Sequence, residues 1–233
     1  MTPKFDLALI PPEPTLDFEL SIWGVGTKLI AGIDEAGRGP LAGPVSAAAI
    51  ILPDDPFLCQ KYHGVRDSKQ MRPADREYWA DILMREALSF GTGFASSGEI
   101  DTLGIIPATL LAVQRALTSM PIQPQHLLLD YIQLPDVIIP QTPIIKGDAR
   151  CLSIAAASIL AKTARDALMR EMEACYPGYG FAKHKGYATR EHLTALDRLG
   201  PCPIHRYSFS PIRREPEDNP GEDKITHSNK EEV

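Results

Sequence analysis

Compact apolar runs alternate along the chain with longer stretches of helical periodicity. Apolar segments rich in small and β-branched residues predict buried strands. Four such segments are KLIAGID from Lys28, VSAAAIIL from Val45, GTGFASS from Gly91 and HLLLDYI from His126. A fifth segment, PQTPIIKGDAR from Pro140, again places an acid after a short apolar stretch. Strands come first and then alternate with helical segments, which favours an α/β fold with a mixed β-sheet flanked by helices.

Apolar residues spaced as on one face of a helix predict four helices. They begin at Ala74, near Pro107, near Ser153 and after Thr189, which is a candidate N-terminal cap. The helix near Pro107 should end at Pro121, and the helix from Ser153 should be long and rich in small residues.

With 233 residues, 44% hydrophobic and 23% charged, the chain is suited to one sizeable domain. We expect this domain at residues 28–213, after a lead-in at 1–27 and before an acidic, disordered tail at 214–233. No apolar run is long enough to cross a bilayer, and acids and prolines near the N-terminus are atypical of a secretory signal. We therefore expect a cytoplasmic protein. Four scattered cysteines argue against a zinc site or a disulfide framework.

The net charge of −6 is unevenly distributed. Residues 142–214 hold twelve Lys or Arg against six Asp or Glu, whereas residues 1–141 hold ten against seventeen. Binding of a polyanion through the later part is compatible with this pattern if the early acids hold cations.

Several acids follow predicted strands. Asp34 and Glu35 follow KLIAGI, Asp130 follows HLLL, and Asp148 follows the last apolar segment. We expect the first strand to end at Asp34, so that both neighbouring acids can turn towards one site. If the strands are adjacent, these carboxylates converge and require cations between them, because like charges repel. The alternative for each acid is a solvated strand end or a helix cap, and Asp101 and Asp136 are interpreted as loop acids.

Ligands that are all oxygen select hard cations such as Mg²⁺ or Mn²⁺. Two such ions can activate water and stabilise the leaving oxygen of a phosphoryl displacement, which is the chemistry of a nuclease.

A glycine-framed arginine, GRGPLAG from Gly37, follows the first pair of acids. Without Cβ atoms, Gly37 and Gly39 would let a ligand approach the backbone, and Arg38 could contact phosphate or stack on a sugar or base. A tight connection between strands is the alternative. A dinucleotide-binding loop fits poorly, because the glycine spacing differs and the acids would face the pyrophosphate. The P-loop pattern is absent.

Several blocks resemble the ribonuclease HII family, the type 2 ribonucleases H, in that family's order. They are GIDEAGRGPLAGPV from Gly32, DSK from Asp67, LLLD ending at Asp130, KGD ending at Asp148, ASILAK from Ala157, YGFAKHKGY ending at Tyr187 and HRYSF from His205. The resemblance spans roughly residues 28–213. It implies an RNase H-like α/β fold with a C-terminal helical extension.

The resemblance also implies a metal-dependent endoribonuclease. It would cleave the RNA strand of RNA–DNA hybrids, and cut 5′ of ribonucleotides embedded in duplex DNA during their removal, leaving 3′-hydroxyl and 5′-phosphate ends. By the same resemblance, the catalytic and metal-binding carboxylates are Asp34, Glu35, Asp130 and Asp148, with Mn²⁺ or Mg²⁺ as the cofactor. Gly37, Arg38 and Gly39 would read the ribose 2′-OH, and Tyr187 would stack at the junction between ribonucleotide and deoxyribonucleotide. The chain departs from the family at Tyr131, where glycine is usual, and at Ala155, where serine is usual.

Further candidates are less specific. Candidate phosphate contacts are Lys69, Lys183 and Lys185. A structural or phosphate-contacting role is favoured for His184 and His205. The long helix also carries Arg165 and Arg170, which are compatible with its solvated face. We expect a monomer without a membrane partner. Two alternatives are a non-catalytic nucleic-acid-binding module, which would not respond to metal ions, and a nucleotide-cofactor enzyme, which a dinucleotide would protect.

Overall fold

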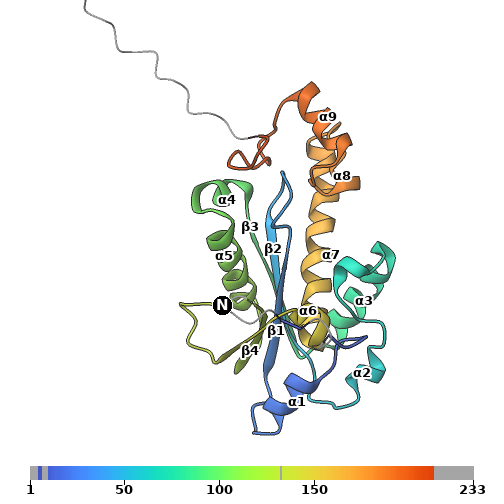
Figure 1. The fold of residues 1–233 in the computed structure, drawn as a ribbon, viewed down its shortest axis with the longest axis vertical. Helices are drawn as coiled ribbons and strands as arrows, with labels where there is room; N and C mark the ends of the chain where they lie inside the picture. Colours follow the sequence, from blue (N-terminus) through green and yellow to red (C-terminus); the bar gives the residue numbers. More distant parts are fainter. Residues whose placement is uncertain (1–4, 7–9, 132, 213–233) are drawn as a thin grey trace, which may run out of the picture.

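The computed structural model describes residues 5–6, 10–131 and 133–212. At its centre lies a five-stranded sheet with the order β3-β2-β1-β4-β5 (Figure 1). The strands are β1 (Ile30–Ala36), β2 (Val45–Ile51), β3 (Ser89–Ala95), β4 (His126–Asp130) and β5 (Gln141–Ile144). The first three are antiparallel neighbours, whereas β4 runs parallel to β1 and β5 runs parallel to β4. The predicted mixed sheet is confirmed.

Helices cover both faces of the sheet. The helices are α1 (Asp17–Trp23), α2 (Leu58–Lys61), the 3₁₀ turn η2 (Ser68–Gln70), α3 (Pro73–Glu86), α4 (Ser97–Leu103), α5 (Ile105–Thr118), α6 (Gly147–Arg150), α7 (Leu152–Cys175), α8 (Phe181–His184) and α9 (Arg190–Leu199). Helix α7 packs on β1 and β2 with α3 beside it, while α5 packs on β2 and β3 from the opposite side (Figure 1). Helices α8 and α9 gather at the far end of α7, which is the predicted C-terminal extension (Figure 1).

The region of α4 and α5 agrees with the sequence prediction in part. The helix expected to start near Pro107 is α5, which begins at Ile105, but a separate helix that was not predicted, α4, precedes it. Gly104 divides them with a φ of 84°, a backbone conformation that glycine adopts readily. Asp101 lies in α4 instead of a loop, and its carboxylate accepts hydrogen bonds from the backbone N–H groups of Tyr207 and Ser208.

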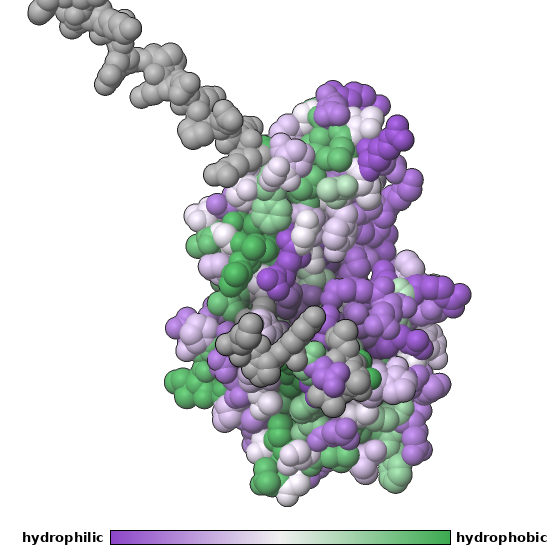
Figure 2. Space-filling model, viewed as in Figure 1, coloured by the Kyte–Doolittle hydropathy of each residue, from purple (hydrophilic) through white to green (hydrophobic). Residues whose placement is uncertain are grey.

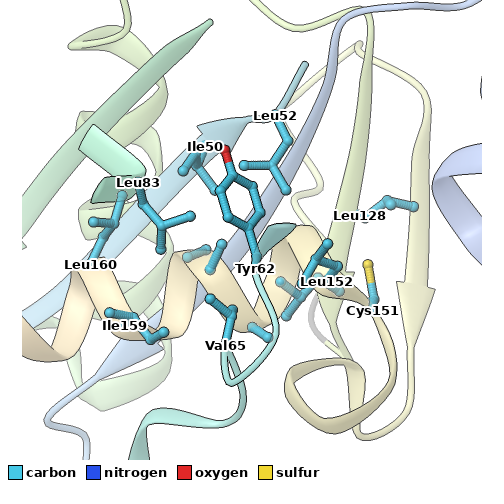
Figure 3. Close-up of a cluster of buried hydrophobic side chains, with 14 of the residues drawn as sticks. Ile50, Leu52, Tyr62, Val65, Leu83, Leu128, Cys151, Leu152, Ile159 and Leu160 are labelled. Atoms are coloured by element: carbon cyan, nitrogen blue, oxygen red, sulfur yellow. The ribbon is translucent and has the colours of Figure 1, made fainter. Parts of the chain in front are cut away.

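Two hydrophobic cores lie on the two faces of the sheet. The core under α7 is built around fully buried side chains such as Ile50, Tyr62 and Leu152 (Figure 3). Helix α7 can lie close to β1 because Gly32 has no side chain: a Cβ there would come within 2.2 Å of the backbone of Ser153. This close packing fixes the long helix directly behind the strand that carries the first two acids. Among the described residues, no helix has the length and apolar character needed to cross a membrane.

Helix α1, in the predicted lead-in, is joined to this core. Glu19 is buried, and its Oε1 accepts hydrogen bonds from the backbone N–H of Ser153 at 2.8 Å and from the Sγ of Cys151 at 3.1 Å. The Ser153 N–H belongs to the first turn of α7, where backbone donors lack partners within the helix. Glu19 therefore caps the start of α7 from a distant part of the chain. The predicted tail at 214–233 lies outside the described residues.

Replacing Glu19 with glutamine is expected to stabilise the protein at pH 8 and to leave it unchanged at pH 4. Burial raises the pKa of Glu19 above its ordinary value, so that between the unfolded and the folded pKa the folded state binds a proton that the unfolded state has released. Stability then falls as the pH rises from the unfolded pKa through the folded one. Glutamine keeps the Oε1 acceptor without this loss, and each 1 kcal/mol gained raises the Tm by about 2–4 °C for a chain of this size.

Thermal unfolding of both proteins at pH 4 and pH 8 measures this effect. The exposed Asp17→Asn substitution on the same helix is the matched control and should shift neither midpoint appreciably. A Glu19→Gln protein that is less stable than the parent at pH 8 would contradict the burial argument.

Candidate active site

The first two acids lie within strand β1. The expectation that the strand ends at Asp34 is wrong, because β1 continues to Ala36 and pairs with β2 through both acids. The Asp34 side chain is buried, with 4% of the residue exposed, whereas Glu35 lines an open cleft. The carboxylate of Glu35 accepts a hydrogen bond from Nη1 of Arg38 at 3.1 Å. Both carboxylates nevertheless serve one site, since they interact electrostatically with each other and with the next two acids.

The other two acids come from the end of β4 and from α6, which follows β5. Ile33 of β1 is paired with Leu129 of the parallel strand β4, so the residues that follow them, Asp34 and Asp130, lie at the same edge of the sheet. The backbone N–H of Gly147 donates to Oδ1 of Asp130 at 2.8 Å. This hydrogen bond ties the turn after β5 to the end of β4 and places Asp148, in α6, next to Asp130. The structure thus brings the four carboxylates together.

Their proximity shows in their pKa values. Burial, followed by the charges of Glu35, Asp130 and Asp148, raises the pKa of Asp34 well above its ordinary value. Burial and then the charge of Asp148 raise the pKa of Asp130 to about 6. Crowded carboxylates of this kind are stabilised in their ionised form by positive charge placed among them.

Lys69 provides positive charge at this site. Its Nζ lies 3.3 Å from Oδ2 of Asp148 and 4.0 Å from Oδ1 of Asp67. Burial alone would lower the pKa of Lys69, but the carboxylates of Asp34, Asp67 and Asp148 raise it overall. The sequence-based candidate for a phosphate contact therefore lies among the acids, where it also acts as their counter-charge.

The donor set fits hard divalent cations. Within the described ranges, no three His, Cys, Asp or Glu side chains are already arranged tightly enough to hold a metal ion. The four carboxylates nonetheless converge, they supply only oxygen ligands, and the raised pKa of Asp34 shows that more positive charge would stabilise them. Zinc, which prefers nitrogen and sulfur ligands, is disfavoured here.

A cleft of about 580 Å³ opens beside the acids. Its lining includes Glu35, Asp130 and every predicted substrate-binding residue, which are Gly37, Arg38, Gly39, Lys69 and Tyr187. The backbone N–H groups of Gly37, Arg38 and Gly39 donate to no acceptor in the described part of the chain. Three successive unpaired N–H groups in a cleft lining are donors available to a ligand oxygen or an anion.

Tyr187 belongs to the C-terminal extension, shortly after α8, and lines the cleft together with the glycine loop. Its residue is 42% exposed, and the Nζ of Lys162 lies 5.7 Å from its ring centroid. An exposed aromatic ring beside a cation is suited to stacking on a base or sugar. Lys162 and Phe209 also line the cleft and were not singled out from the sequence, although Phe209 and Lys162 end two of the quoted blocks.

The remaining candidates lie outside the cleft lining. Lys183 is exposed and pairs with Glu191, and Lys185 lines a neighbouring pocket with Lys162 and Tyr187. His184 and His205 are buried, which favours the structural role over phosphate contact. His205 packs against Phe181, and burial lowers its pKa to about 4, so its imidazole is neutral at physiological pH. Figure 2 shows the hydrophilic surface over α3 and over α9.

Two arginines beneath the glycine loop were missed or misinterpreted. Arg165 was compatible with a solvated face of α7, but it is fully buried, as is Arg206 of the HRYSF block. Their guanidinium groups hydrogen-bond only to backbone carbonyl groups, several of them in residues 37–44. The available indication was the helical spacing, because Arg165 lies four residues after Ala161 and four before Met169, both buried on α7.

The two departures from the family pattern have different consequences. Tyr131 has a φ of 65°, a left-handed conformation that glycine adopts without strain, which explains why glycine suits this position. Its side chain is 73% exposed, so the ring meets no steric obstacle. Ala155 is fully buried in α7 within the core, away from the cleft lining.

Comparison with known proteins supports one family. The family model described as Ribonuclease HII matches residues 31–212. A ribonuclease HII of Moorella thermoacetica is 54% identical over 184 residues, covering 79% of this chain and 87% of the relative. One of Anaeromyxobacter sp. is 52% identical over 198 residues, covering 85% of this chain but 62% of that longer protein. The crystal structure of the ribonuclease H2 from Pyrococcus horikoshii OT3 matches with a TM-score of 0.64 and 26% identity, covering 79% of this chain and 95% of the other. With this match, the order of its motifs and its mixed sheet, the chain belongs to the ribonuclease HII family.

Proposed function

We propose that this chain is a metal-dependent endoribonuclease that cleaves RNA in RNA–DNA hybrids and cuts 5′ of ribonucleotides embedded in duplex DNA, in the course of their removal. Membership of the ribonuclease HII family supports the reaction class. The observation that carries the substrate preference is the cleft itself. Glu35 and Asp130 line it, with the buried acids Asp34 and Asp148 close to them, and the unpaired backbone N–H groups of residues 37–39 belong to the same lining.

The carboxylates of Asp34, Glu35, Asp130 and Asp148 would hold Mn²⁺ or Mg²⁺. When bound, the cations supply Lewis acidity that activates the attacking water and stabilises the leaving 3′-oxygen of the substrate. The hydrogen bond from Gly147 to Asp130 keeps one carboxylate directed at the site. The ammonium group of Lys69, already beside Asp148, is placed to contact a phosphate oxygen once cations balance the acids.

The glycine loop and Tyr187 would select the sugar. A ribose 2′-oxygen can accept hydrogen bonds from the N–H groups of Arg38 and Gly39, and a deoxyribose offers no such acceptor. Tyr187 would stack on the next nucleotide. Because all these groups come from residues 28–213 of a single chain, we also propose that this segment is the catalytic domain and that it acts as a monomer.

A panel of four duplexes tests the proposed function: all-DNA, DNA with one ribonucleotide, an RNA–DNA hybrid and an RNA–RNA duplex. With Mn²⁺ present, we expect cleavage of the second and third duplexes, giving 3′-hydroxyl ends, because both contain a ribose that the loop can read. The all-DNA duplex should be cut at least about 100-fold more slowly, since a site built to hydrogen-bond a hydroxyl strongly rejects the analogue without it. Comparable cutting of all-DNA would refute the assigned role of the glycine loop.

A further inference from the structure

Arg165 and Arg206 are buried cations without carboxylate partners. Each is fully buried, and neither forms an ion pair within 4 Å among the residues that the structure describes. Burial, followed by the charge of Arg165, lowers the pKa of Arg206 to about 9, because both disfavour the charged form of the Arg206 guanidinium. Two unpaired guanidinium groups in one core cost considerable free energy. Their hydrogen bonds indicate what they achieve there.

Arg206 determines which way the glycine loop faces. Its Nη2 donates to the carbonyl oxygen of Gly37 at 2.6 Å, its Nη1 donates to that of Arg38 at 2.8 Å, and its Nε donates to that of Gly43 at 3.0 Å. In a planar trans peptide the C=O and the following N–H point in opposite directions. Because Arg206 holds the carbonyl groups of Gly37 and Arg38 on the buried side, the N–H groups of Arg38 and Gly39 are directed away from it, and these residues line the cleft.

Arg165 joins the same loop to the segment that carries Tyr187. Its Nε donates to the carbonyl of Pro44 at 2.9 Å and its Nη2 to that of Ala42 at 3.1 Å, while its Nη1 donates to the carbonyl of Lys185 at 3.0 Å. The centre of its guanidinium lies 5.9 Å from the centroid of the Tyr187 ring. Arg165 therefore connects the sugar-reading backbone to the stacking ring across one guanidinium.

We propose that Arg165 and Arg206 are positioning residues for ribose recognition. Arg206 presents the N–H groups of Arg38 and Gly39 to the 2′-oxygen, and Arg165 holds Tyr187 at the correct separation from them. The inference rests on the proposed function, since it concerns how the same cleft distinguishes ribose from deoxyribose. Lysine at either position would keep the charge but cannot span three carbonyl groups, because its single ammonium lacks the planar fork of arginine.

The test measures binding without cleavage. In an Asp34→Asn background and without divalent cations, the affinity for a labelled DNA duplex with one ribonucleotide is compared with that for the all-DNA duplex of the same sequence. We expect Arg206→Lys to reduce the ratio of the two affinities about tenfold while binding to all-DNA stays within about twofold. Arg165→Lys should also lower the ratio, and adding Tyr187→Ala to it should cost less than in the parent, because the two residues act together.

The matched control is Arg198→Lys, which replaces an exposed arginine that also donates to a backbone carbonyl, that of Gly178. This control should leave the ratio unchanged. An unchanged ratio in folded Arg206→Lys and Arg165→Lys proteins would overturn the inference and leave the proposed function intact. An Asp34→Asn parent that does not distinguish the two duplexes would instead overturn the proposed function and the inference with it.

Hydrogen exchange keeps the inference testable if the lysine variants do not fold. In the Asp34→Asn protein, amide exchange at Arg38 and Gly39 should be fast without nucleic acid and should slow on addition of the ribonucleotide-containing duplex, but not of all-DNA. Slow exchange in the free protein, or equal protection by both duplexes, would show that these N–H groups do not face the substrate.

Discussion

Substitution of Asp34 with asparagine is expected to reduce cleavage of a DNA duplex with one ribonucleotide by at least about 100-fold, because losing a ligand should cost more than the 10- to 100-fold typical of outer-shell changes. Asp34 is the most buried of the four carboxylates, and its pKa is raised well above the ordinary value by burial and by the other three acids. Asparagine keeps the size and one oxygen of this side chain but removes its charge. The site would then attract divalent cations less strongly, while the cleft and the glycine loop keep their shape.

Thermal stability gives a second measurement of the same substitution. At pH 8 without divalent cations, Asp34→Asn should melt at a higher temperature than the parent, because a carboxyl group with a raised pKa destabilises the folded state once the pH exceeds its unfolded pKa. Saturating Mn²⁺ should raise the Tm of the parent more than that of the variant. A ligand at 100 times its dissociation constant stabilises the folded state by about 2.7 kcal/mol.

The exposed acid Asp81 lies in α3 outside the cleft lining and provides the matched control, so Asp81→Asn should change neither cleavage nor the effect of Mn²⁺. If the Asp34→Asn protein cleaved at the parent's rate, the assignment of Asp34 as a metal ligand would be wrong. Absence of any effect of Mn²⁺ on the parent would favour the non-catalytic nucleic-acid-binding module.

The convergence of the acids could be predicted because each acid follows a compact apolar run. Adjacent strands bring such positions to one edge of a sheet, and the parallel pairing of β1 with β4 does so for Asp34 and Asp130. Whether β1 stops at Asp34 or continues to Ala36 was not predictable, because glycine and alanine are compatible with either. The continued strand makes the two neighbouring acids unequal, since Asp34 is buried and Glu35 lines the cleft.

The buried arginines could not be predicted in the same way. Periodicity assigns charged residues to solvent, and that assumption fails where a guanidinium is satisfied by backbone carbonyl groups instead of water. Two of the carbonyls that hold Arg165 belong to residues 42 and 44, more than 120 positions before it, and the third belongs to residue 185, so no local sequence pattern indicates these contacts. The same limit applies to Asp101, whose partners lie more than 100 residues away.

The cleft explains why acids and bases are distributed unevenly along the chain. The acid-rich first part of the chain contributes Asp34 and Glu35, and the basic later part contributes Lys162, Arg165 and Arg206 around the same loop. Because Arg165 and Arg206 are buried beneath the loop, Lys162 is the cation from this later part that lines the cleft, together with Glu35 and Asp130. Net charge alone, at −6, would have obscured a nucleic-acid partner.

Replacing Gly37 with alanine is expected to reduce the kcat/KM for the one-ribonucleotide duplex by about 100-fold or more while preserving the effect of Mn²⁺ on the Tm. The φ of Gly37 is 90°, which strains any L side chain, and a Cβ there would come within 2.0 Å of Nε of Arg165. Either the loop or the guanidinium has to move, and a displacement of about 1 Å at a reacting site can cost about 100-fold in rate. The four carboxylates are untouched, so metal binding should persist.

Substitutions at two other glycines help to identify why kcat/KM falls in Gly37→Ala. At Gly98, on the exposed first turn of α4, a Cβ would meet no atom within 4 Å, so Gly98→Ala should leave cleavage unchanged. At Gly39, in the same loop as Gly37, a Cβ would also meet no atom within 4 Å of it, so Gly39→Ala should preserve the Tm. If Gly37→Ala cleaved as fast as the parent, the loop would not require its present conformation. Loss of activity together with loss of the Mn²⁺ effect would mean instead that the substitution reaches the carboxylates, since Gly37 directly follows β1, the strand that positions Asp34 and Glu35.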